Sequence, residues 1–190
     1  NTAINPTSVT ITASEVGVMT TLTDLARNAA PRNVAADIGR LFGEAIAKKQ
    51  DTDMTALFDG FSTAIGDGTE AITTAKVFQA ASDLRAAALN LNDCAVVLHP
   101  KIAYDLKANL TNTFANSNAN DLANEALRSG FVGTLAGMRV FETSNISNTG
   151  NAGDYKGAAF HRDALAMAEM QGLKIETQRD ASLRADEIVA

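Results

Sequence analysis

Residues 33–60, NVAADIGRLFGEAIAKKQDTDMTALFDG, decide the fold because they form the strongest helical pattern in the chain. Apolar side chains recur every three or four residues, which places them on one face of a helix and leaves charged residues opposite. These apolar residues are Val34, Ile38, Leu41, Phe42, Ala45, Ile46, Met54, Leu57 and Phe58. Asn33 is a suitable N-cap, and Gly60 ends the pattern. We predict a helix of about 26 residues, about 39 Å long, more than twice the average length in globular proteins.

Two shorter elements are predicted before this helix. Val9, Ile11 and Ala13 alternate with polar residues, which is the pattern of a half-buried strand. Apolar residues then recur at helical spacing over residues 22–29, and Pro31 interrupts that spacing. We therefore expect a strand and a short helix to precede the long helix.

The elements predicted after the long helix do not alternate regularly between strand and helix. In chain order they are a helix over 73–88, a buried strand over 94–98, a helix from Pro100, an asparagine-rich loop over 109–124 leading into a short helix at 122–128 closed by Gly130, a hairpin over 131–141, and strands at 158–161 and 173–178. This order predicts an α+β fold.

The composition predicts a thin hydrophobic core. Hydrophobic residues make up 46% of the 190 residues, but Trp is absent and aromatic residues account for only 5%. Alanine is the commonest apolar residue, and because it buries little area, the hydrophobic stabilisation of each chain is modest. We expect such a chain to depend on its neighbours for part of its stability.

The charge and the apolar runs exclude several classes of partner. A net charge of −6 argues against tight nucleic-acid binding, which depends on Lys and Arg meeting phosphates, and against an anionic membrane surface. The apolar runs fall far short of the ~20 residues that a spanning helix needs. A single cysteine excludes an internal disulfide framework. We expect synthesis in a reducing cytoplasm.

His99 and His161 are the candidates for acid–base chemistry near neutral pH. His99 lies between a predicted strand and Pro100, where its ring is suited to cap the following helix, and His161 ends a predicted strand. Cys94 lies in an apolar run and is expected to be a small buried hydrophobe. We expect structural roles for all three residues, and the sequence predicts no catalytic residue.

Motifs for metals and nucleotides are incomplete. Asp51 and Asp53 resemble the start of a calcium loop, but Ala56 and Ser62 stand where such a loop needs glycine and glutamate. Residues 66–68, GDG, lack the third glycine and the preceding strand of a dinucleotide-binding motif. We therefore predict neither a metal site nor a bound cofactor, and no enzymatic activity.

Three stretches resemble the major capsid proteins of tailed bacteriophages, in the order in which that family has them. They are residues 95–106, AVVLHPKIAYDL, residues 130–143, GFVGTLAGMRVFET, and residues 157–168, GAAFHRDALAMA, which are followed by GLKIE at 172–176. The first resembles the strand and helix of the family's axial domain, the second the hairpin that follows, and the third the return toward the peripheral domain. Together with the long helix they span most of the chain.

The resemblance implies the Hong Kong 97 type of fold, with a long spine helix, a peripheral β-sheet domain and an axial domain. It implies that residues 1–22 are the returning strand of an extended loop and that 23–71 belong to the peripheral domain with the spine helix. Residues 72–170 are then the axial domain, and 171–190 return to the peripheral domain. An N-terminal arm is expected before Asn1, and a last strand after Ala190.

The function implied is that of a major capsid protein, which self-assembles into the icosahedral shell enclosing phage DNA. The expected partners are copies of itself in hexamers and pentamers, together with scaffolding, portal and decoration proteins. DNA is expected to be enclosed without tight specific binding, and no membrane is involved. The resemblance places the protein in the virion, after assembly in the host cytoplasm.

Three alternatives stay open on the sequence. An encapsulin-like compartment shell protein shares the fold but packages protein in place of DNA. A small cytoplasmic hydrolase would use His99 or His161. A soluble binding module would use the asparagine-rich loop and would be a stable monomer.

Overall fold

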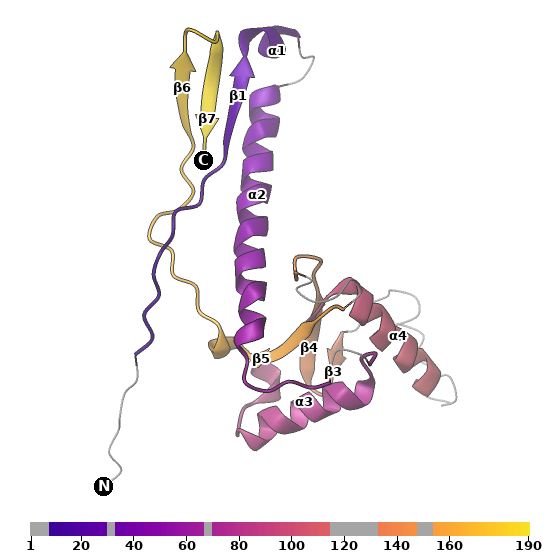
Figure 1. Ribbon diagram of the computed structural model, residues 1–190. Coiled ribbons are helices and arrows are strands. Elements are labelled where there is room, and N and C mark those ends of the chain that lie inside the picture. Colours follow the sequence, from indigo (N-terminus) through magenta and orange to yellow (C-terminus); the bar gives the residue numbers. More distant parts are fainter. Residues whose placement is uncertain (1–7, 30–32, 67–69, 115–132, 148–153) are drawn as a thin grey trace. The chain divides into compact units, whose positions relative to one another are not determined.

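The computed structural model describes residues 8–29, 33–66, 70–114, 133–147 and 154–190 (Figure 1). The chain divides into two compact units, and there is a sheet in each. Unit 1 comprises Asn1–Gln50 and Met167–Ala190, and unit 2 comprises Asp51–Ala166. Among the described helices, none is both long and apolar enough to cross a membrane.

Unit 1 is built on a three-stranded antiparallel sheet in the order β1-β7-β6. Its strands are β1 (Met19–Thr23), β6 (Glu176–Asp180) and β7 (Ala185–Val189). The central strand β7 therefore pairs with β6, its neighbour in the sequence, and with β1, which lies far away in the sequence. Val18 and Ala190 extend the β1–β7 pairing, since each peptide N–H donates to the other's carbonyl at 2.9 Å.

The predicted long helix is confirmed as α2 (Val34–Ala56), which continues as a 3-10 turn over Leu57–Gly60. Asn33 is its N-cap, because its side-chain oxygen accepts from the peptide N–H of Ala36. The short helix α1 (Asp24–Ala29) precedes it. Within unit 1, Phe42 of α2 is buried in a cluster with Leu22 of β1 and Ile188 of β7. This small cluster is the core of unit 1, as the composition predicts.

The strand predicted around Val9, Ile11 and Ala13 is wrong. The described part of this segment has no regular secondary structure, and the side chains of Val9 and Ile11 are 89% and 53% exposed. Alternation alone does not make a strand, because a strand also needs a neighbour to complete its backbone hydrogen bonds. The first strand lies instead at β1.

The C-terminal strands also differ from the prediction. β6 begins at Glu176, so Leu173 and Ile175 lie before it and are exposed. The central strand β7, with Ala185 and Ile188 buried, was not predicted. Its short sequence, ADEIV, contains two acidic residues, so it lacks the apolar pattern that predicts a buried strand.

Unit 2 contains a four-stranded mixed sheet in the order β3-β4-β2-β5. Strand β2 (Cys94–Leu98) runs parallel to β4 (Met138–Glu142) and antiparallel to β5 (Gly157–His161). Strand β3 (Thr134–Leu135) pairs with β4 in a tight hairpin. The turn residues Ala136 and Gly137 both have positive φ, 55° and 86°, which fits the backbone of a two-residue hairpin turn. The predicted strands at 94–98 and 158–161 and the hairpin are thereby confirmed within the described residues.

Two hydrophobic clusters form the core of unit 2. Helices α3 (Thr74–Ala86) and α4 (Pro100–Phe114) contribute Val77, Ala81, Ala103 and Leu106 to the larger cluster. The strands contribute the rest of its buried residues, together with Leu91: Cys94, Val96, Leu98, Met138 and Val140. A second cluster gathers Phe58, Ile146 and Ala158, with the partly buried rings of Phe61 and Phe160 beside Phe58.

Helix α4 runs to Phe114, so the predicted loop cannot begin at Asn109. The reason is a tertiary contact. The side-chain oxygen of Asn109 accepts from the peptide N–H and from the hydroxyl of Thr74, both at 3.1 Å, at the first turn of α3. Because its side chain accepts hydrogen bonds from polar groups at the start of a neighbouring helix, Asn109 is accommodated inside α4. The rest of the predicted loop, the helix at 122–128 and Gly130 lie outside the described residues.

Gly157 permits the close approach of β5 to β2 and α4. A Cβ at this position would lie 2.5 Å from Cδ2 of Leu98 and 2.7 Å from the carbonyl oxygen of Val97. We expect Gly157→Ala to lower the free energy of unfolding by about 1–3 kcal/mol, because the backbone of β2 must shift. Gly60→Ala is the control, since a Cβ there meets nothing within 4 Å. Urea unfolding measures both, and equal stability of the two variants would contradict the close approach.

Candidate functional site

His99 caps a helix. Its Nδ1 accepts from the peptide N–H of Lys101 at 3.2 Å, and its carbonyl accepts from Ala103 at 3.0 Å, so it is the N-cap of α4. The ring also stacks on Tyr155, with centroids 4.1 Å apart and planes at 15°. The predicted capping role of His99 is confirmed.

His161 does the same for a 3-10 turn over Arg162–Ala164. Its Nδ1 accepts from the peptide N–H of Asp163 at 3.3 Å. One carboxylate oxygen of Asp163 lies 3.4 Å from the same nitrogen. In both histidines, Nδ1 thus accepts a hydrogen bond at the start of a helical turn, which is a structural role.

The other candidates from the sequence also have structural roles. Cys94 is fully buried, its thiol lies 3.4 Å from the carbonyl oxygen of Asn90, and burial raises the pKa of the thiol. Asp51 accepts from Thr143 and Asn145, which ties the loop after β4 to α2. The described segments contain no group of three or more His, Cys, Asp or Glu residues that could hold a metal ion.

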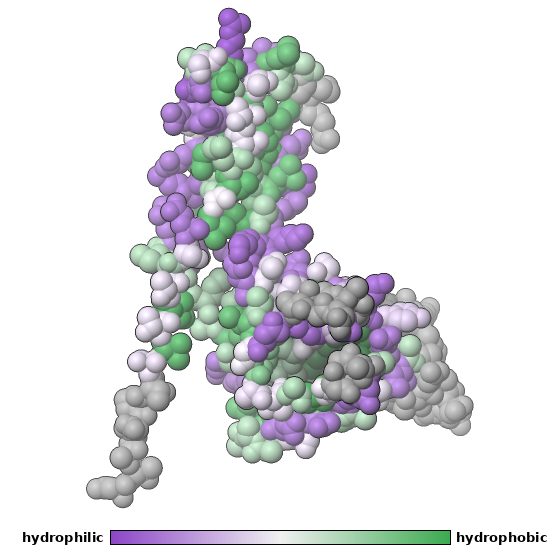
Figure 2. All heavy atoms as spheres, in the orientation of Figure 1, coloured by the Kyte–Doolittle hydropathy of each residue, from purple (hydrophilic) through white to green (hydrophobic). Residues whose placement is uncertain are grey.

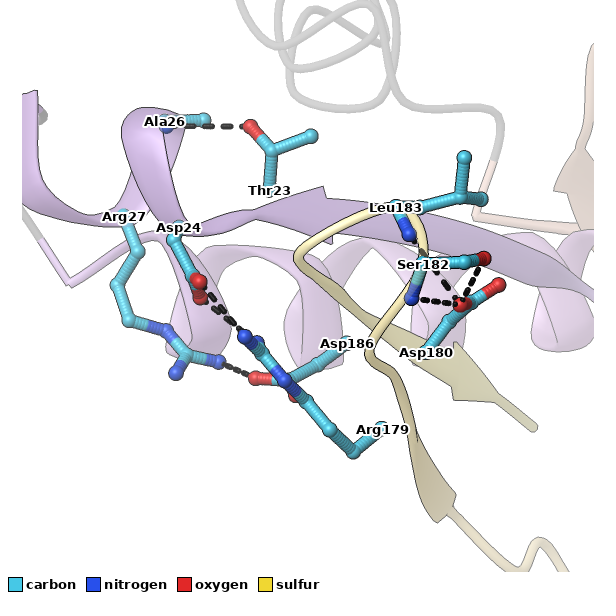
Figure 3. Close-up of polar contacts among 9 residues, drawn as sticks. All are labelled: Thr23, Asp24, Ala26, Arg27, Arg179, Asp180, Ser182, Leu183 and Asp186. Atoms are coloured by element: carbon cyan, nitrogen blue, oxygen red, sulfur yellow. Dashed lines mark hydrogen bonds and ion pairs between the residues drawn. The ribbon is translucent and has the colours of Figure 1, made fainter.

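The strongest polar feature is an ion-pair cluster in unit 1, here called the Arg179 cluster, formed by Asp24, Arg27, Arg179 and Asp186 (Figure 3). Arg179 binds both carboxylate oxygens of Asp24, at 2.7 and 2.6 Å, and one oxygen of Asp186 at 3.3 Å. Arg27 also pairs with Asp186. The cluster thereby ties α1 to β6 and β7.

No local sequence pattern predicts this cluster, because Asp24 and Arg179 are 155 positions apart. The pKa of Asp24 is lowered chiefly by its hydrogen bonds from Arg179. The pKa of Asp186 is lowered chiefly by its hydrogen bond from Arg27, and the pKa of Arg179 is raised by both carboxylates. The Arg179 cluster therefore favours the charged forms of Asp24, Asp186 and Arg179.

The turn between β6 and β7 is fixed by Asp180. One of its carboxylate oxygens accepts from the peptide N–H of Ser182 at 2.8 Å, from the Ser182 hydroxyl at 2.6 Å, and from the peptide N–H of Leu183 at 3.3 Å (Figure 3). These bonds lower the pKa of Asp180. Arg184 follows with a positive φ of 48° and closes the turn.

Exposed hydrophobic side chains are concentrated in unit 1. Of the sixteen large hydrophobic residues exposed in the described part of the chain, twelve belong to this unit, and Figure 2 shows several hydrophobic surfaces on its visible face. Those twelve are Val9, Ile11, Val16, Met19, Leu25, Leu41, Met167, Met170, Leu173, Ile175, Leu183 and Val189. Seven of them lie in the irregular stretches 8–18 and 165–175. Within the described residues, unit 1 therefore exposes most of the large apolar side chains that the core does not bury.

Solved structures with the same fold come from phages. A chain from Mycobacterium phage Che8 superposes with a TM-score of 0.69 at 22% identity, over 92% of this chain and 62% of that one. The capsid structure of the cyanophage P-SCSP1u gives 0.66 at 17% identity, over 100% and 74%. The mature capsid of bacteriophage PhiM1 gives 0.58 at 15%, over 94% and 66%. The present chain thus spans less than two thirds of the Che8 chain.

The chain thus has the α+β fold of these phage capsid chains, which agrees with the Hong Kong 97 type implied by the sequence resemblance. A family model described as phage capsid protein matches residues 6–189. The chain belongs to that family. A search of curated proteins gives no significant match. The compartment, hydrolase and binding-module alternatives are not favoured by these findings.

We expect His99→Ala to lower the free energy of unfolding by about 1 kcal/mol, because α4 loses its N-cap. His99→Asn is the matched control, since an asparagine oxygen can accept the same N–H bond. Thermal unfolding of both variants checks this. Equal stability of His99→Ala and the parent protein would show that the Nδ1 bond contributes nothing.

The Arg179 cluster predicts an acid-sensitive unit 1. Because the folded-state pKa values of Asp24 and Asp186 lie below their unfolded values, the stabilisation is complete above about pH 4 and is lost as the pH falls through the lower folded values. We expect Arg179→Met to be less stable at neutral pH and to lose less stability on acidification. Arg40→Met, which removes an equal charge from a helix-surface pair with Glu44 at 2.7 Å, is the control. Parallel stability curves for the parent and Arg179→Met between about pH 6 and pH 2 would contradict the assignment.

Proposed function

We propose that this chain is the major subunit of a self-assembling icosahedral shell that encloses phage DNA. Membership of the phage capsid family and the fold shared with phage capsids support this. The observation on the molecule itself that carries the proposal is the set of exposed apolar residues in unit 1. An isolated monomer would leave this apolar area in water.

Contacts between copies would supply the stability that the thin core lacks. Burying a large apolar side chain fully stabilises by roughly 1.5–3 kcal/mol relative to leaving it exposed. Val9 and Met170, each 89% exposed, are among the residues that would bury the largest fraction of their surface in such contacts. Repeated over every subunit, such contacts stabilise a closed assembly without a deep core in each chain.

The partners we propose are copies of the chain in hexamers and pentamers, with scaffolding, portal and decoration proteins joining them. Assembly would take place in the host cytoplasm and the product would be the virion shell. The net charge of −6 suits a container that holds DNA without binding its phosphates tightly. The activity proposed is assembly, without a catalytic step.

We also propose how the chain is divided in this role. Residues 1–22 would serve as the returning strand of an extended loop, 23–71 as the peripheral domain with the spine helix, 72–170 as the axial domain, and 171–190 as the return into the peripheral domain. The exposed segment at residues 8–13, which has no strand structure here, would gain a neighbour in the shell.

The test is to purify the full-length protein and examine it by negative-stain electron microscopy with light scattering. We expect closed particles tens of nanometres across. Analysis of their contents for DNA or protein separates a phage shell from a protein-loaded compartment. A monodisperse monomer under all assembly conditions would refute the proposal.

A further inference from the structure

We propose that the C-terminal hairpin formed by β6 and β7 is exchanged between copies of this chain, so that in the shell it completes the unit 1 sheet of a neighbour. The proposal rests on the proposed function and names the element that joins neighbouring copies. It is carried by the hairpin's own turn, by the exposed stretch that leads to the hairpin, and by the contacts that attach the hairpin to unit 1.

The hairpin holds its own shape. β6 and β7 pair antiparallel along their whole length, from Glu176 opposite Val189 to Asp180 opposite Ala185. In the turn, the carboxylate of Asp180 accepts two hydrogen bonds from Ser182 and one from Leu183. Because the strand pairing and the turn are both made within residues 176–189, the hairpin can move as one piece.

The stretch that leads to the hairpin is exposed along its whole length. Residues 165–175 form no helix or strand, and every residue from 166 to 175 is exposed. These ten residues span about 33 Å when extended, at about 3.3 Å per residue, which is close to the diameter of a small domain. Because no buried side chain anchors them, they can take a second path without loss of packing.

The contacts that attach the hairpin to unit 1 are made by β7 and by the end of β6. They are the pairing of β7 with β1, the burial of Ile188 beside Leu22 and Phe42, and the ion pairs of the Arg179 cluster (Figure 1). The partners in these contacts all lie within residues 18–42, whichever copy supplies them. An exchanged hairpin therefore keeps the same contacts, and exchange of an identical element between copies costs little.

Assembly favours the exchange. In a free chain the hairpin meets its own β1, because the two segments of unit 1 are joined through unit 2 and their encounter is intramolecular. In a shell, neighbouring copies are held close together, which raises the effective concentration of a neighbour's hairpin as well. Releasing the hairpin exposes few side chains, since only Ala185 and Ile188 are buried within it. A hairpin passed from each copy to the next is a head-to-tail contact, which generates closed rings.

Disulfide trapping in the full-length protein tests the exchange. Val18 and Ala190 exchange both backbone hydrogen bonds, so by the alternation of an antiparallel ladder Thr21 and Glu187 form a non-hydrogen-bonded pair, which is close enough for a disulfide. Thr21→Cys subunits and Glu187→Cys subunits are mixed, assembled, oxidised with glutathione disulfide, and alkylated before a denaturing, non-reducing gel. Each chain carries one of the two new cysteines, so a disulfide between positions 21 and 187 joins two copies. We expect such dimers from the assembled mixture.

Two controls make a negative result informative. The parent protein, which retains the buried Cys94, shows any dimer that does not come from the new cysteines. The double variant Thr21→Cys with Glu187→Cys, oxidised before assembly, should form the disulfide within one chain. An efficient disulfide there, with no 21–187 dimers in particles from the mixture, would overturn the proposal. If the double variant forms no disulfide, the next pair of the same kind, Met19 and Val189, replaces both positions.

The same double variant measures whether assembly needs the exchange. Oxidised before assembly, it has its hairpin locked to its own β1, and we expect the yield of particles to fall about tenfold or more, because a locked hairpin cannot reach a neighbour. Reduction with a thiol breaks the lock and should restore the yield to within about twofold of the parent. Equal yields from the oxidised and reduced protein would also overturn the proposal. If the parent protein itself forms no particles, the proposed function fails instead, so the two failures are distinguishable.

Discussion

The pairing of β7 with β1 is the interaction on which unit 1 depends. It joins residues 19–23 to residues 185–189 and places β7 between β1 and β6. Only then do Leu22 and Ile188 form the small cluster that buries Phe42 of the long helix. Without this pairing, the apolar face of the first part of α2 would have no sheet to cover it. Unit 1 is thus held together by a pairing between residues far apart in the sequence. Forming it costs chain entropy, and few buried side chains offset that cost.

The ion pairs of the Arg179 cluster also hold β6 and β7 to the helix that follows β1. Arg179 and Asp186 lie on the paired strands β6 and β7, and Asp24 and Arg27 lie on the helix that follows β1. Exposed ion pairs contribute little individually, but here they define the geometry of a small unit that has little core. Unit 2 is held differently. Two hydrophobic clusters and the close approach at Gly157 stabilise it, and polar side chains such as His99 and Asn109 complete helix ends.

These two modes of stabilisation fit the proposed role of a shell subunit. Unit 2 contains two hydrophobic clusters, whereas unit 1 exposes large apolar residues, many of them along its irregular stretches. Surfaces of this kind are satisfied by neighbours rather than by the chain itself.

The sequence by itself determined the long helix, the buried strand at 94–98, the hairpin around Gly137 and the cap at His99, because each depends on local periodicity, turn geometry or a neighbouring backbone group. It also determined that the core would be thin. Only the tertiary structure decided that Val9 and Ile11 are exposed, that Asn109 belongs to a helix and caps α3, and that β7 is a central strand. The Arg179 cluster was decided there too. Strand pairing joins residues as far apart as Met19 and Val189, ion pairing joins residues 159 positions apart, and no local pattern specifies such partners.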